Sequence, residues 1–145
     1  MQTVDEFDLS RFLTAQAPVF SRAFAELTTG RKRSHWMWFM FPQLRGLGSS
    51  DMASFYGIGS IEEARAYLDH PILSERLRLC TRTVLDLEGH SINAIFGSPD
   101  DMKFRSSMTL FELAAVDEDN VFRQALAKYC GGLPDERTLA MIRGA

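Results

Sequence analysis

The sequence has few of the residues that usually indicate a metal site, a disulfide framework or a membrane anchor. Only two of its 145 residues are cysteines, Cys80 and Cys130, and only three are histidines. The two cysteines are too few for a disulfide framework, and they do not form a metal-spaced pair. No apolar run approaches the roughly 18 residues that a membrane-spanning helix needs. We therefore expect no metal, no cofactor and no membrane association.

The sequence also lacks an excess of positive charge. Sixteen lysines and arginines face nineteen aspartates and glutamates, a net charge of −3. This balance argues against a surface built to bind duplex DNA. The first ten residues, MQTVDEFDLS, are acidic and hold no apolar run, so they do not match a signal peptide. We expect a cytoplasmic protein.

The common catalytic and nucleotide-binding motifs are missing as well. The chain holds no G-x-S-x-G, S-x-x-K, H-E-x-x-H, C-x-x-C or G-x-G-x-x-G, and no P-loop. Each of these patterns places a nucleophile, a metal ligand or a phosphate cradle at a fixed spacing. Without them, the sequence assigns no reaction and no catalytic residue.

What the sequence does contain is a helical pattern over nearly its whole length. Residues 19–27 place their apolar side chains on one helical face, and Gly30 follows as a helix-ending glycine. No run alternates apolar and polar residues long enough to predict a strand. A chain of 145 residues is an ordinary single-domain length. We expect residues 1–145 to form one compact all-α domain of about seven or eight helices.

Several polar residues stand where helices are expected to begin. Asp8, Ser34 and Ser98 can each cap the first turn of a helix. Ser60 and Glu63 form the S-x-x-E pattern of a capping box. We expect helices to start at these positions, with the one after Ser34 covering residues 35–41.

The richest stretch of the chain begins with three cations, Arg31, Lys32 and Arg33. Positive charge just before a helix start opposes the helix dipole, unless an anion binds there. Alternatively, the three side chains belong to the end of the preceding helix and face solvent. Asp100 is expected to be a helix-start charge, or else to pair with Arg31 or Lys32 across the fold.

Both tryptophans of the chain follow these cations. The segment from His35 to Phe41 is apolar nearly all round, which is typical of a buried helix whose indole N–H groups find acceptors. Alternatively, Trp36 and Trp38 form a stacking wall for a planar ligand, with His35 as the candidate proton carrier. Gln43 either satisfies loop backbone groups or reads a ligand.

A second polar group lies on the helix expected after Ser98. Lys103, Ser106 and Thr109 share this helix with an apolar face made by Phe104, Met108 and Phe111. A lysine one turn from small hydroxyl residues is able to cradle a phosphate or carboxylate. The same small residues also allow another helix to pack closely, and both interpretations remain open.

Several blocks of the chain together resemble the bacterial domain-of-unknown-function-1810 family, whose members are often labelled calpastatin. The blocks are RKRSHWMWFMFPQLRGLG, Tyr56-Gly57-Ile58 and IFGSPDDMKFRSSMTLF. The resemblance implies an all-helical fold with a central helix surrounded by others, and no established activity. It also draws attention to the polar residues within the blocks: His35, Gln43, Asp100, Lys103, Ser106 and Thr109.

Two functions from different classes follow from these residues. The first is the binding of a small anionic ligand, nucleotide-like or phosphate-like, in a cationic and aromatic pocket. The expected ligand-binding residues are Arg31, Lys32, His35, Trp36, Trp38, Gln43, Lys103, Ser106 and Thr109. The second is a protein-interaction module with an aromatic and arginine interface and no ligand. Single-stranded nucleic-acid binding is a third reading, which the net charge disfavours. The first requires residues 31–43 and 103–109 to meet in the fold.

Overall fold

The structure, a computed structural model, describes residues 5–144, in which helices are joined by loops. The described residues form ten helices, α1 (Ser10–Gln16), α2 (Phe20–Thr29), α3 (Met37–Met40), α4 (Asp51–Phe55), α5 (Ile61–Asp69), α6 (Pro71–Leu85), α7 (Ile92–Phe96), α8 (Asp100–Ala114), α9 (Val121–Tyr129) and α10 (Glu136–Ile142). The all-α class is confirmed. There are ten helices in the described range rather than seven or eight, and three of them, α3, α4 and α7, have only four or five residues. The helix expected over residues 35–41 is shorter than predicted and covers only Met37–Met40. Over this range no helix is both long and apolar enough to span a membrane.

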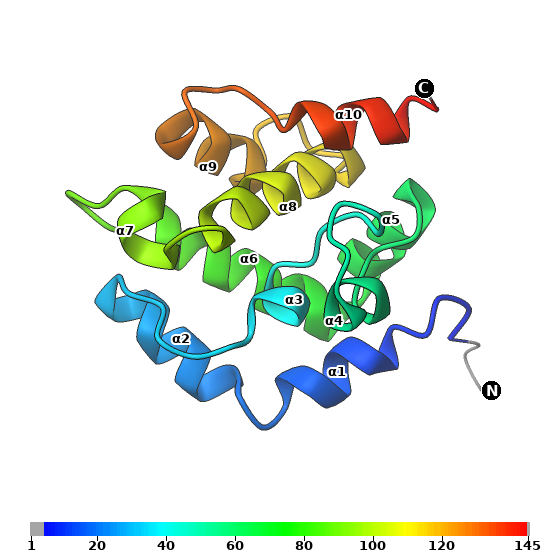
Figure 1. Cartoon of the computed structure of the whole chain (residues 1–145), viewed down its shortest axis with the longest axis horizontal. Helices are drawn as coiled ribbons and strands as arrows, with labels where there is room; N and C mark the ends of the chain where they lie inside the picture. The colour runs from blue at the N-terminus through cyan, green and yellow to red at the C-terminus, as the bar shows by residue number, and fades with distance from the viewer. Residues whose placement is uncertain (1–4, 145) are drawn as a thin grey trace.

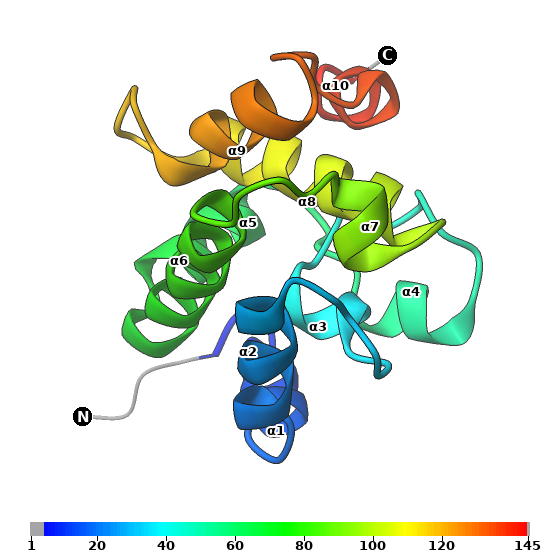
Figure 2. The same cartoon turned by 90° about the vertical axis from the view of Figure 1, so that its left-hand side faces the viewer.

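Helix α8 lies at the centre of the molecule, as the family resemblance implies. It contacts α5, α7, α9 and α10, which surround it in both views (Figures 1 and 2). Phe104, Met108 and Phe111 recur at helical spacing and are fully buried. Ser107 and Thr109 are buried too, because their small side chains let neighbouring helices approach the remaining faces. Because α8 is surrounded in this way, its side chains contact several parts of the fold.

Aromatic side chains join α8 to the chain around α3 and α7. The Phe104 ring centroid lies 5.3 Å from that of Phe41 and 4.8 Å from that of Phe96. All three side chains are buried. Aromatic pairs of this kind contribute about 0.5–1.5 kcal/mol each beyond the burial of their area. The cluster therefore fixes the short α3 segment against the central helix.

Two predicted helix boundaries are confirmed in detail. The Ser60 hydroxyl oxygen accepts a hydrogen bond from the Glu63 backbone N–H at 3.1 Å, the first half of the capping box. The Glu63 carboxylate bonds to the N–H of Gly59, one residue before the cap. Gly30 ends α2 with a φ of 81°, a left-handed conformation that favours glycine.

Three predicted caps are wrong, for different local reasons. Asp8 has a positive φ of 54°, and α1 begins after Leu9, whose N–H is bound by the Asp5 carboxylate. Ser34 lies two residues before the N-cap position of α3, which Trp36 occupies without a side-chain bond. At α8 that position belongs to Pro99 rather than to Ser98.

Candidate functional site

The chain between α2 and α3 is held by one carboxylate, that of Glu26 in α2. Its Oε1 accepts hydrogen bonds from the backbone N–H groups of Arg33 at 2.8 Å and Ser34 at 3.0 Å, and from the Trp36 indole at 2.9 Å. Its Oε2 accepts a bond from the Ser34 hydroxyl. Burial raises the pKa of Glu26, but the hydrogen bonds from Ser34, Arg33 and Trp36 outweigh it and lower the pKa to about 2. The carboxylate is therefore ionised and sets the path of residues 31–36.

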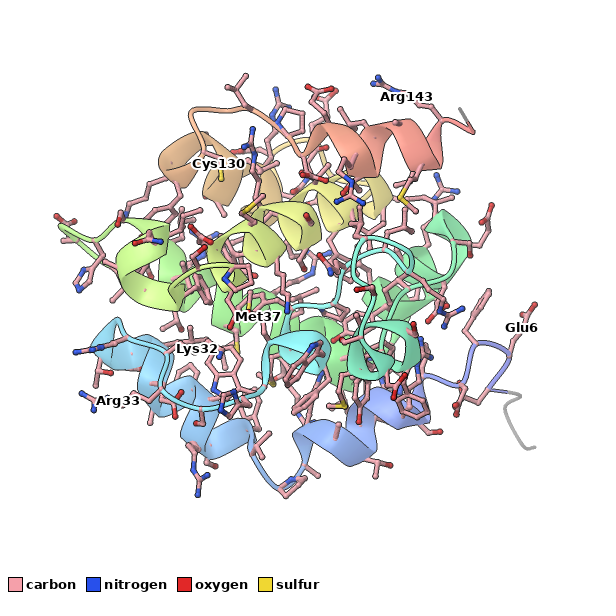
Figure 3. All side chains as sticks on the ribbon, viewed as in Figure 1. Glu6, Lys32, Arg33, Met37, Cys130 and Arg143 are labelled. Atoms are coloured by element: carbon pink, nitrogen blue, oxygen red, sulfur yellow. The ribbon has the colours of Figure 1, made fainter. Side chains whose placement is uncertain are left out.

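Lys32 connects this segment to the central helix. Its backbone N–H donates to the Ile95 carbonyl at 2.7 Å, and its Nζ lies 2.9 Å from Asp100 Oδ2. The ammonium also lies 5.2 Å from the Trp36 ring centroid. Only 8% of the Lys32 side chain is exposed, whereas Arg33 is exposed and extends outward (Figure 3). Lys32 is therefore a paired, structural cation.

Lys103 lies on the other side of Asp100 and is held less tightly. Its Nζ is 3.6 Å from Asp100 Oδ1, longer than a hydrogen bond, and 5.4 Å from the Trp38 ring centroid. A quarter of its side chain, 25%, is exposed. The ammonium is oriented by its neighbours but keeps its donors available. This arrangement also shows that the two polar stretches of the sequence meet.

Gln43 and Lys103 line two neighbouring hollows. The smaller, of about 10 Å³, is lined by Met37, Trp38, Phe41, Gln43, Ala53, Tyr56, Gly57 and Lys103. The larger, of about 180 Å³, is lined by Gln43, Leu47, Gly48, Pro99, Met102, Lys103, Ser106, Asp135 and Arg137. We call the larger one the cationic hollow. The smaller holds at most one water molecule, so it leaves no room for a ring to stack beside Trp38.

The cationic hollow contains polar groups that the protein itself does not satisfy. Within residues 5–144, the Gln43 amide makes no hydrogen bond, and the exposed Arg137 guanidinium makes neither a hydrogen bond nor an ion pair. The Ser106 hydroxyl donates to the Met102 carbonyl at 3.1 Å and keeps its acceptor lone pairs. Lys103 adds the second cation. Together these groups can bind an anion that carries several acceptor oxygens.

Thr109 and Arg105 hold one wall of the cationic hollow in place. Thr109 Oγ1 donates to the Arg105 carbonyl at 2.9 Å and accepts from the Asp135 N–H at 2.8 Å. The Arg105 guanidinium donates to the carbonyls of Leu133 at 2.9 Å and Pro134 at 3.2 Å. These bonds attach the start of α10 to α8. Thr109 is therefore a positioning residue, not a wall of the hollow.

Replacing Thr109 by valine is expected to lower the free energy of unfolding by about 1–3 kcal/mol, because the Asp135 N–H loses its acceptor. Urea unfolding at neutral pH measures this loss. The matched control is Thr83→Val on α6, whose hydroxyl makes the same bond to the carbonyl four residues earlier, at 2.9 Å. Equal losses in both variants would contradict the anchoring role of Thr109.

The structure brings together four of the nine predicted ligand-binding residues. Gln43, Lys103 and Ser106 line the cationic hollow, and Trp38 lies beside Lys103. The others lie elsewhere: Arg31 and His35 are exposed outside both hollows, Lys32 is paired, and Trp36 and Thr109 are each 1% exposed.

Sequence patterns did not identify Arg137 and Asp135 as site residues. They lie about 30 residues beyond Lys103, and only the packing of α10 on α8 brings them to it.

The two cysteines lie outside both hollows. Burial raises the pKa of Cys80 to about 12 and also raises that of Cys130. Both thiols are therefore protonated near neutral pH. In the described part of the chain, no three histidine, cysteine, aspartate or glutamate side chains gather as a metal site.

Comparison with known proteins places the chain in a family. No curated protein gives a significant match. The chain is similar to the crystal structure of the conserved hypothetical protein Rv1873 from Mycobacterium tuberculosis, with 56% sequence identity and a TM-score of 0.94 over 97% of this chain and 100% of that chain. The family model described as "Protein of unknown function (DUF1810)" matches residues 6–142. The chain therefore belongs to the DUF1810 family of proteins of unknown function.

Proposed function

We propose that the protein binds a small anionic ligand, such as a phosphate monoester, in the cationic hollow. The observation that carries the proposal is that two cations, Lys103 and Arg137, line one hollow, with only one loose ion pair between them and the rest of the described chain. Lys103 lies 3.6 Å from its only carboxylate partner among residues 5–144, and Arg137 has no such partner in that range. An anion between them would form charge-assisted hydrogen bonds with both.

Each lining group has a distinct role in this proposal. Lys103 supplies a point charge, and Arg137 supplies a planar fork of donors that suits phosphate or carboxylate oxygens. The unbonded Gln43 amide orients the ligand through a further donor or acceptor. Asp100 does not contact the ligand but holds Lys103 in place. Since His35 is exposed outside the hollow, the proposal is a binding function without an assigned proton carrier.

The form of the site limits the kind of ligand. The hollow of about 180 Å³ suits a small molecule, while the crevice of about 10 Å³ beside Trp38 excludes a stacked ring. A phosphate-like ligand therefore fits better than one whose base stacks on Trp38.

The alternative of a protein-interaction module is less well supported. It requires the tryptophans to form an exposed patch, yet Trp36 is 1% exposed and its indole is bonded to Glu26.

Replacing Lys103 by methionine is expected to weaken the binding of methyl phosphate by about 10- to 100-fold, the range that the loss of one charge-assisted hydrogen bond gives. Isothermal titration at low ionic strength measures the dissociation constant. The control is Arg65→Met, which removes one charge from the exposed face of α5. Arg65 lines neither of the two hollows described above.

Loss of affinity in both variants to the same extent would show a general charge effect and would contradict the assigned site. No binding of methyl phosphate or inorganic phosphate to the unmodified protein would contradict the proposed function itself.

A further inference from the structure

One wall of the cationic hollow carries a negative charge whose position is fixed. Asp135 Oδ2 accepts the Thr138 N–H at 2.9 Å and the Thr138 hydroxyl at 2.6 Å. The Asp135 N–H is itself bound by Thr109 at 2.8 Å. Asp135 Oδ1 makes no hydrogen bond to any described residue. The carboxylate thus caps α10 with one oxygen, its other oxygen has no partner among residues 5–144, and Asp135 is one of the residues that line the hollow.

Among the described residues, the charged side chains that line the hollow form no ion pair with one another. Asp135, Lys103 and Arg137 all line it, yet none of the ion pairs among residues 5–144 joins Asp135 to either cation. Because both its backbone and its Oδ2 are bonded, Asp135 cannot easily turn toward them. A ligand that is only an anion would itself offer Asp135 no hydrogen-bond donor and would place a like charge in the same hollow.

From this pattern we infer that the ligand carries a hydroxyl group beside its anionic group, as glycerol phosphates and sugar phosphates do. The inference rests on the proposed function. The anionic group binds Lys103 and Arg137, and the hydroxyl donates to Asp135 Oδ1. An ammonium could also donate to Asp135, so the test below includes an ammonium-bearing ester.

The test compares two phosphate monoesters with the same three-carbon skeleton, glycerol 3-phosphate and n-propyl phosphate, by isothermal titration. The unmodified protein is expected to bind glycerol 3-phosphate about tenfold or more tightly, since a hydrogen bond to a charged group discriminates to this extent. In Asp135→Asn the preference should fall to about twofold or less. Asparagine is also a favoured helix cap, so α10 is retained. The control Glu136→Gln removes a neighbouring exposed charge and should keep the preference.

The outcomes separate this inference from the proposed function. Equal affinity of the unmodified protein for the two esters would overturn the hydroxyl contact and leave anion binding intact. An unchanged preference in Asp135→Asn would overturn the role of Asp135. Tighter binding of phosphoethanolamine than of glycerol 3-phosphate would show that the donor is an ammonium and would also overturn the inference. Binding of none of these esters would contradict the proposed function.

Discussion

Replacing Arg11 by methionine is expected to lower the free energy of unfolding by about 3–5 kcal/mol, the cost of leaving a buried charge without its partner. The Arg11 guanidinium lies 2.7 Å from Glu63 Oε2, and their side chains are 6% and 5% exposed. The same guanidinium donates to four backbone carbonyls, those of Phe7, Asp8, Phe55 and Gly57. It therefore ties α1 to the end of α4 and to the loop that follows it. Urea unfolding at neutral pH measures the loss.

A double-variant cycle with Glu63→Met separates the ion pair from the carbonyl contacts. If the pair is coupled, the double variant loses less than the sum of the two single losses, by about 0.5–3 kcal/mol. Arg65→Met, at an exposed position on α5, is the control and should change stability by about 0.5 kcal/mol or less. Additive losses would contradict a coupled buried pair.

Replacing Glu26 by glutamine is expected to lower the free energy of unfolding at neutral pH by about 3 kcal/mol. A pKa held at about 2 instead of 4.5 corresponds to this amount. Glutamine keeps only one acceptor oxygen, and its NH2 group would face groups that donate to the carboxylate. These are the Ser34 hydroxyl and the N–H groups of Arg33, Ser34 and Trp36. Chemical unfolding of both proteins at pH 7 gives the difference.

The same carboxylate predicts how stability depends on pH. Because the pKa of Glu26 is lower in the folded protein than in the unfolded chain, its contribution is complete above pH 4.5 and is lost as the pH falls toward 2. The difference between wild type and Glu26→Gln should therefore shrink over this interval. The pKa of Asp5 is also lowered, so Asp5 also makes the protein less stable as the pH falls. The control Asp5→Asn removes this contribution and keeps the one from Glu26. A constant difference between pH 7 and pH 2.5 would contradict the ionised, hydrogen-bonded state of Glu26.

Periodicity in the sequence predicted the helices well, and it predicted the path between them poorly. The apolar spacing of Phe104, Met108 and Phe111 identified the buried face of α8, and Gly30 identified the end of α2. Ser34 failed as a predicted cap because its hydroxyl binds the Glu26 carboxylate eight residues earlier. A local sequence pattern does not show that a side chain elsewhere will bind the hydroxyl that was expected to cap the helix.

The sequence predicted the candidate site only in part, because spacing along the chain does not show which side chains become neighbours in the fold. The two tryptophans stand two residues apart, so helical geometry places them on different sides. It does not say that Trp36 is buried against Glu26 while Trp38 lies beside Lys103. Arg137 could not be found, because the pattern of α10 shows which of its faces is apolar and not which helix that face meets.

The most direct test of anion binding is a crystal structure of the unmodified protein with arsenate, a phosphate analogue that can be located by its anomalous scattering. We expect one arsenate in the cationic hollow, within hydrogen-bond distance of Lys103 Nζ and the Arg137 guanidinium, with Lys32 still paired to Asp100. An ordered arsenate at another surface, with the hollow holding only water, would contradict the proposed site.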